Sequence, residues 1–219
     1  MKLRSSYLYA SIISILFYSC FNNTNVLLEV APVFSNHMVL QQKSDVPIWG
    51  SGSPGRNIEI FASWGEVSKT NVTENGSWNI SIKTPDYGGP YEVKVVSDKK
   101  EITFKDVMIG EVWLTSGQSN MEWPMWARIL NQKEEIKNAN FKNIRMFNVP
   151  RNLNGTNIND TSWKVATSEN VVDFSAVGYF FAREIYQKLG VPVGILNSSW
   201  GGTRVEAWTS IEKLASMKE

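Results

Sequence analysis

The fold class follows from residues 107–114, which read Val107-Met108-Ile109-Gly110-Glu111-Val112-Trp113-Leu114. This run is apolar almost throughout, and only Gly110 and Glu111 interrupt it. Such a run predicts a strand that is covered on both faces, as in a parallel sheet. Two more strands are predicted at 143–149 and 193–196, with a helix between them. Strand, helix and strand in succession indicate an α/β domain, which we place at residues 107–219.

The helix before residue 190 is the clearest in the chain. Asp173 or Ser175 can cap its start, Lys188 falls in its last turn, and Gly190 with Pro192 ends it. The apolar residues that recur at four-residue spacing along it are Val177, Phe181, Ile185 and Leu189. A further helix is predicted to begin just before Glu219.

Residues 27–106 show the period-two alternation of half-buried strands. The alternation is clear at 57–62, 77–83, 91–95 and 102–104, and turn residues separate these segments. Asn75-Gly76 between two such segments predicts a β-hairpin. Several short strands at this spacing predict a small antiparallel β-sandwich, which carries no catalytic set of its own.

The first 20 residues resemble an export signal. Lys2 and Arg4 precede an apolar run at 7–18, which is too short to span a bilayer as a helix. Cys20, the only cysteine, follows this run and leaves two alternatives open: a lipoprotein cleavage site with a lipid on Cys20, or an ordinary signal peptide. Both alternatives predict an exported protein, periplasmic or at the cell surface.

The amino-acid composition excludes few classes of function. Lys plus Arg is 22 and Asp plus Glu is 21, and this net charge of +1 gives no reason to expect a nucleic-acid partner. The chain offers no Cys/His cluster for a metal, and no cofactor is expected. Nine Trp residues are the unusual feature. Exposed Trp rings can stack on sugars, but we expect most of these side chains to lie in the core.

Two segments that follow predicted strands carry the candidate chemistry. Gly117-Gln118-Ser119-Asn120 follows the strand at 107–114, and Trp200-Gly201-Gly202-Thr203 follows the strand at 193–196. Functional groups of open α/β sheets gather at the carboxyl ends of the strands. A serine there can act as a nucleophile once a base takes its proton, and consecutive glycines can offer backbone N–H groups to an oxyanion. Each segment alone is equally typical of an ordinary loop.

Taken together, these segments and several others resemble the sialate O-acetylesterases, a branch of the SGNH-type serine hydrolases. The resemblance covers nearly the whole chain after the export signal. The matching blocks lie at 34–42, 47–50, 88–91, 110–122, 174–182 and 200–208. It implies a small N-terminal antiparallel β-sandwich followed by part of an SGNH-like, flavodoxin-like domain with a parallel sheet. It also implies removal of O-acetyl groups from sialic acid or related sugars, so that the partner would be an acetylated carbohydrate.

The resemblance assigns roles residue by residue. Ser119 becomes the nucleophile, and its own N–H with that of Gly201 or Gly202 forms part of the oxyanion hole. Gln118 and Asn120 shape the turn and contact substrate. Glu206 and Trp208 line or brace the pocket.

The sequence departs from the family in its histidines. The family's base is a His in an Asp-x-x-His segment near the C-terminus, whereas His37, the only His here, lies in the predicted β-sandwich. We therefore expect a truncated chain or a fragment that holds the nucleophile without its base. Two alternatives stay open: a carbohydrate-binding fragment without turnover, and a fragment that is unstable because its last strand exposes an edge.

Overall fold

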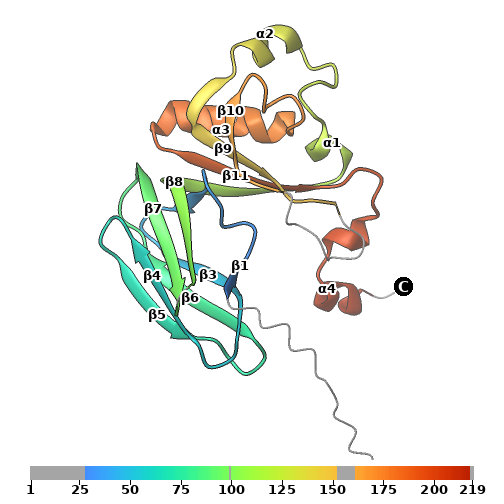
Figure 1. Ribbon diagram of the computed structural model, residues 1–219. Helices are drawn as coiled ribbons and strands as arrows, with labels where there is room; N and C mark the ends of the chain where they lie inside the picture. Colours follow the sequence, from blue (N-terminus) through green and yellow to red (C-terminus); the bar gives the residue numbers. More distant parts are fainter. Residues whose placement is uncertain (1–27, 99, 152–160, 218–219) are drawn as a thin grey trace, which may run out of the picture.

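The computed structural model describes residues 28–98, 100–151 and 161–217 (Figure 1). The predicted export signal and Cys20 lie outside the described residues. In Figure 1 an α/β region lies above a β region. One long strand, β8 (Lys100–Gly117), runs through both. The strand predicted at 107–114 is therefore the second part of a longer one, which continues through the expected domain boundary at 106/107.

The β region is a sandwich of two layers that are antiparallel except where β2 pairs in parallel with β8. The first layer has the strand order β1-β3-β6. The second continues from β8 through β7 and β4 to β5. The bounds are β1 (Leu28–Val30), β2 (Val39–Gln41), β3 (Asp45–Gly52), β4 (Asn57–Ala62), β5 (Val67–Asn71), β6 (Ser77–Lys83) and β7 (Gly88–Ser97).

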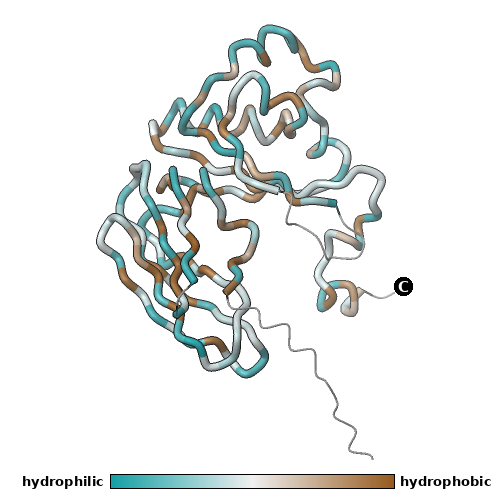
Figure 2. The backbone as a smooth tube through the Cα atoms, in the orientation of Figure 1, coloured by the Kyte–Doolittle hydropathy of each residue, from teal (hydrophilic) through white to brown (hydrophobic). Residues whose placement is uncertain are grey.

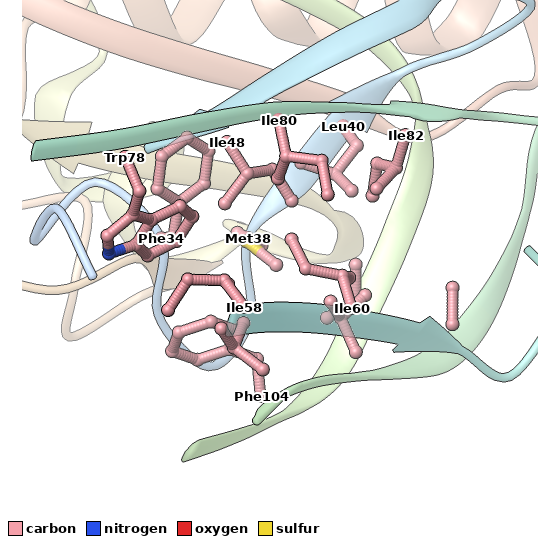
Figure 3. Close-up of a cluster of buried hydrophobic side chains, with 14 of the residues drawn as sticks. Phe34, Met38, Leu40, Ile48, Ile58, Ile60, Trp78, Ile80, Ile82 and Phe104 are labelled. Atoms are coloured by element: carbon pink, nitrogen blue, oxygen red, sulfur yellow. The ribbon is translucent and has the colours of Figure 1, made fainter. Parts of the chain in front are cut away.

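The alternation that predicted these strands is the alternation of their burial. Along β6, Trp78, Ile80 and Ile82 are buried while the residues between them are exposed. Ile58 and Ile60 of β4 meet them from the other layer, so that one apolar core fills the sandwich (Figure 3). Figure 2 shows the same strands as a succession of hydrophilic and hydrophobic segments.

The predicted hairpin at Asn75-Gly76 is wrong in one respect. The turn exists, since the Gly76 N–H donates to the Thr73 carbonyl at 3.0 Å and Gly76 has a φ of 81°. However, β5 before it pairs with β4, whereas β6 after it pairs with β3. Val72 is buried between the two strands, and the chain crosses there from one layer of the sandwich to the other.

The α/β region confirms the predicted parallel sheet. The end of β8 pairs in parallel with β11 (Val193–Ser199), and β11 pairs in parallel with β9 (Asn140–Asn148). A short strand that the sequence did not indicate, β10 (Lys164–Thr167), adds to β9 in the antiparallel sense. The helices are α1 (Ser119–Glu122), α2 (Gln132–Lys137), α3 (Ala176–Leu189) and α4 (Ile211–Ser216), with a 3₁₀ turn, η1, at Val205–Trp208.

The predicted long helix is α3, and Ser175 rather than Asp173 caps it. The Ser175 hydroxyl accepts the Gly178 N–H at 3.0 Å, and Gly190 ends the helix in the left-handed conformation. The side that packs on the sheet consists of Ala176, Gly178, Tyr179 and Ala182. Small residues there let the helix approach the strands, while the bulkier Val177 and Phe181 face outward, 47% and 36% exposed.

The β region covers the other face of the parallel sheet. Phe147 of β9 and Trp163 before β10 are buried in the sandwich core, and the Trp163 indole donates to the Val33 carbonyl at 2.7 Å. Gly194 of β11 permits this contact, because a Cβ there would lie 2.8 Å from Val39 Cβ. The sheet is thus buried on both faces, as the apolar strand at 107–114 predicted.

The expected exposed edge lies elsewhere than the sequence suggested. The last strand, β11, is interior, since β8 and β9 flank it. In the α/β part of the sheet, within the described residues, the edges without a partner strand are β10 and the part of β8 beyond its pairing with β2 at residues 108–110. At that edge the Val112 N–H is satisfied by the Gln41 side chain at 2.9 Å.

Candidate active site

Ser119 lies at the carboxyl end of β8, where the strand becomes a short turn of helix. The strand ends at Gly117, whose φ of 146° favours glycine. Gln118 is the N-cap of α1, and the Glu122 N–H donates to the Gln118 carbonyl at 2.9 Å. Ser119 is an exposed residue.

The two segments singled out in the sequence come together at this point. Gly117 is in register with Ser199 of β11, and the Trp200 N–H donates to the Gly117 carbonyl at 2.9 Å. The Gln118 side-chain amide also donates to the Thr203 carbonyl and so joins the two segments. The loop after β11 is therefore fixed against the turn that carries Ser119.

A side chain on Gly201 would crowd Ser119. A Cβ on Gly201 would lie 3.3 Å from both Cα and Cβ of Ser119 and 2.6 Å from Glu122 Oε2. Gly202 is different, because its φ is 77° and a Cβ there would meet nothing within 4 Å. Gly201 thus allows the close approach of the two loops, and Gly202 allows the turn that follows.

Glu122 is a charged neighbour that the role assignments from sequence missed. Its carboxylate accepts the Gly201 N–H and pairs with Arg151. The Gly201 amide, one of the two expected oxyanion donors, is therefore engaged by Glu122 in this structure. The Gly202 amide has no hydrogen-bond acceptor in the part of the chain that the structure describes, so it is the more available donor.

The other predicted site residues lie around the same loop. Asn120 is exposed in α1, and Glu206 is exposed in η1. Trp208 is half-buried, and its indole N–H donates to Thr203 Oγ1 at 2.7 Å. The same Thr203 hydroxyl is 2.7 Å from the Trp200 carbonyl. Trp208 therefore braces the loop that holds Gly201 and Gly202, whereas no contact of Asn120 or Glu206 indicates a role.

A polar network lies beneath this edge of the sheet. The Asn197 side chain is buried and receives hydrogen bonds from Thr115 at 3.2 Å and Ser199 at 3.1 Å. Its amide donates to Asn148 Oδ1 at 3.0 Å. A cavity of about 290 Å³ adjoins the network, and Glu122, Arg151, Asp173, Asn148, Asn197 and Ser199 are among its lining residues. Polar groups thus surround the approach to the carboxyl ends of β8, β9 and β11.

His37 is far from Ser119 and has another partner. Its Nδ1 lies 2.6 Å from Asp106 Oδ2, and the buried Arg145 donates to both oxygens of the same carboxylate, at 2.6 and 3.2 Å. Asp106 and Gly117 are both in β8, separated by roughly 35 Å of strand. Ser119 therefore has no imidazole within reach in this chain.

The environment of Asp106 perturbs its pKa. Partial burial acts to raise the pKa of this carboxyl, but the hydrogen bonds from Arg145 and His37 and their positive charges outweigh burial and hold it below its ordinary value. Asp106 is thus a carboxylate stabilised in its ionised form at the junction of the two regions.

Within the described ranges, no group of three or more His, Cys, Asp or Glu side chains could hold a metal ion. The described helices also include none that is long and apolar enough to cross a membrane.

Known proteins resemble this chain in sequence and in fold. No family model matches the chain. It is 34% identical to the sialate O-acetylesterases of Homo sapiens and Pongo abelii, over 82% of this chain and 38% of each relative. This chain is a homologue of the sialate O-acetylesterases. A crystal structure of a carbohydrate acetylesterase from Xanthomonas citri superposes with a TM-score of 0.79 at 35% identity, covering 86% of this chain and 44% of the other.

The homology confirms the predicted α/β class with its N-terminal antiparallel part. The chain spans about two fifths of the length of the relatives it matches.

Proposed function

We propose that this chain contributes the nucleophile of a serine esterase that removes O-acetyl groups from sialic acid or a related acetylated sugar. The observation that supports it most is the position of Gly201, which brings the loop after β11 into contact with Ser119 at the carboxyl ends of two parallel strands. The names of the homologues, sialate O-acetylesterase and carbohydrate acetylesterase, support the class of substrate.

The proposed reaction has two steps. Ser119 Oγ attacks the acetyl carbonyl while its proton passes to a base, and the oxyanion that forms is stabilised by backbone N–H groups of Ser119 and of Gly202 or Gly201. The sugar hydroxyl leaves with the proton returned by the base. Water then attacks the acetyl-serine, releases acetate and restores the hydroxyl. We assign the base to a histidine outside these 219 residues, because His37 is held at Asp106, far along β8 from Ser119.

Replacement of the nucleophile is the direct test. In a protein that spans the full length of its homologues, Ser119→Ala should lower acetate release from acetylated sugars by about a thousandfold or more. Ser81→Ala, at an exposed serine of β6, is the matched control and should keep full activity. Acetate release retained by Ser119→Ala would refute the assignment.

We further propose that the protein is exported, to the periplasm or the cell surface, on the basis of residues 1–20. If Cys20 carries a lipid, Cys20→Ser should abolish incorporation of labelled palmitate and move the protein from the membrane to the soluble fraction. Unchanged membrane association without label would exclude the lipid anchor and leave the ordinary signal peptide.

A further inference from the structure

The loop after α1 holds two tryptophans in contact with water. Trp123 is 48% exposed and Trp126 is 56% exposed, although the expectation was that most Trp side chains are in the core. Of the nine, Trp78 and Trp163 are buried. Exposed aromatic side chains that lie next to a reactive group can contribute to ligand binding. Two exposed indoles three residues apart in sequence therefore require an explanation.

The exposure does not result from a loosely held loop. Met125, between the two tryptophans, is fully buried, and its N–H donates to the Phe174 carbonyl at 3.0 Å. The Trp126 N–H donates to the Val172 carbonyl at 3.1 Å, and Pro124 forms a β-bridge with Ser175. The backbone is thus fixed to the segment before α3 while both indoles remain outside.

The loop itself also satisfies the polar groups near the rings. The Trp123 indole N–H donates to the Ala127 carbonyl at 2.6 Å, and the Trp126 carbonyl accepts from Gln132 Nε2 at 2.8 Å. No residue from 123 to 127 carries a charge. The surface is therefore apolar and aromatic, which suits a neutral ligand with C–H groups on one face, as pyranose rings have.

Other exposed tryptophans differ in having an aromatic partner. Trp49 packs edge-on against Phe34 with centroids 4.7 Å apart, and Trp113 packs in the same way against Phe181 at 5.2 Å. No ring contact of this kind involves Trp123 or Trp126 among the described residues. Trp123 and Trp126 thus have exposed indoles that no other aromatic ring covers among the described residues.

The position of the pair relates it to the nucleophile. The Trp123 N–H donates to the Ser119 carbonyl at 3.0 Å, so the loop begins at the end of the turn that presents Ser119. A sugar chain whose acetylated ring lies at Ser119 would have its neighbouring rings near this loop.

We propose that Trp123 and Trp126 form an aromatic platform that binds the pyranose rings next to the acetylated ring of an oligosaccharide substrate. The identity of that ligand as a substrate rests on the proposed esterase function. The platform adds affinity through rings remote from the ester, so its loss should be seen with extended substrates and not with a small acetyl ester.

Substrate size provides the test. Trp123→Ala and Trp126→Ala are compared with the parent protein on 4-nitrophenyl acetate and on O-acetylated sialyllactose or O-acetylated xylo-oligosaccharide, whichever is turned over faster. Each variant should lower kcat/KM on the oligosaccharide about tenfold through KM and leave 4-nitrophenyl acetate hydrolysis unchanged. Tyr87→Ala, at a 54% exposed ring of the β region, should change neither. Equal losses on both esters, or no loss on the oligosaccharide, would overturn the platform.

A binding measurement separates this proposal from the proposed function. The de-acetylated oligosaccharide is titrated into the same proteins by calorimetry, with indole N–H resonances followed by NMR. Binding that Trp126→Ala weakens, in a protein that releases no acetate, supports the platform and refutes the esterase. Acetate release with no effect of either Trp substitution on binding supports the esterase and refutes the platform.

Discussion

Two polar clusters lie along β8 and differ in how their groups are paired. One surrounds Asp106 within the strand, and the other surrounds Ser119 in the turn that follows the strand. At Asp106, the carboxylate is shared by His37 and Arg145, and every charge has a partner at hydrogen-bonding distance. Beyond the carboxyl end of the strand, Ser119 is exposed and the Gly202 amide has no acceptor in the described part of the chain. The first cluster joins the β region to the α/β region, whereas the second has groups free to act on a ligand.

This difference shows why the presence of a His–Asp pair does not identify a catalytic base. The pair at His37 has the geometry of a dyad, but Arg145 also pairs with the carboxylate, and roughly 35 Å of strand separates Asp106 from the turn that carries the nucleophile. We infer that the pair stabilises the junction. The predictions below distinguish a stabilising role at Asp106 from a catalytic role at Ser119.

The largest effect on stability is expected at Asp106. Asp106→Asn leaves the Arg145 guanidinium, 5% exposed, without its counter-charge, and should lower the free energy of unfolding by about 3 kcal/mol. His37→Ala is the matched control, because the His37 side chain is 46% exposed, and it should cost less than about 1 kcal/mol. Urea denaturation at pH 6 measures both, and equal losses would contradict this account.

The same variants have an expected pH dependence. The pKa of Asp106 is lower in the folded protein than in the unfolded chain. Its contribution is therefore complete above the unfolded-state pKa, about 4, and is lost as the pH falls through the lower folded-state pKa. The stability difference between the parent and Asp106→Asn should shrink below about pH 4. A difference that stays constant to pH 2.5 would exclude the ion pair as its source.

A smaller effect, on turnover, is expected at Gly201. Gly201→Ala places a methyl group 3.3 Å from Ser119 and close to Glu122, and should lower kcat about ten- to a hundredfold. The Glu122 side chain can move, so the melting temperature should change little. Gly190→Ala, at a φ of 68° after α3 with open space around it, gives the opposite pattern: about 1 kcal/mol less stability and normal kcat. If the two variants behaved alike, contact with Ser119 would not explain the lower kcat of Gly201→Ala.

The sequence predicted the elements better than their contacts. Strands at 57–62 and 77–83 and the helix capped by Ser175 agree with the structure because alternation, capping and turn residues are local signals. The hairpin at Asn75-Gly76 was wrong because a turn does not determine which strands pair. The buried side of α3 depends on Gly178 and Ala182, small residues that a pattern of bulky apolar positions does not reveal.

Part of the candidate site could also be predicted from local sequence signals. Gly117, Ser119 and Gly201 follow strands, and carboxyl ends of neighbouring parallel strands meet at one edge, so their proximity could be expected. The contacts of Glu122 with Gly201 and Arg151 join residues distant in sequence, and no local pattern indicates them. The exposure of Trp123 and Trp126 likewise depends on Met125 being the residue buried between them.

Covalent labelling tests the central claim most directly. A fluorophosphonate reacts with a serine that a base has activated, and peptide mass spectrometry locates the adduct. In a protein that releases acetate from acetylated sugars, we expect one adduct on Ser119, absent from Ser119→Ala and retained in His37→Ala. An adduct on another serine, or labelling that requires His37, would contradict the account.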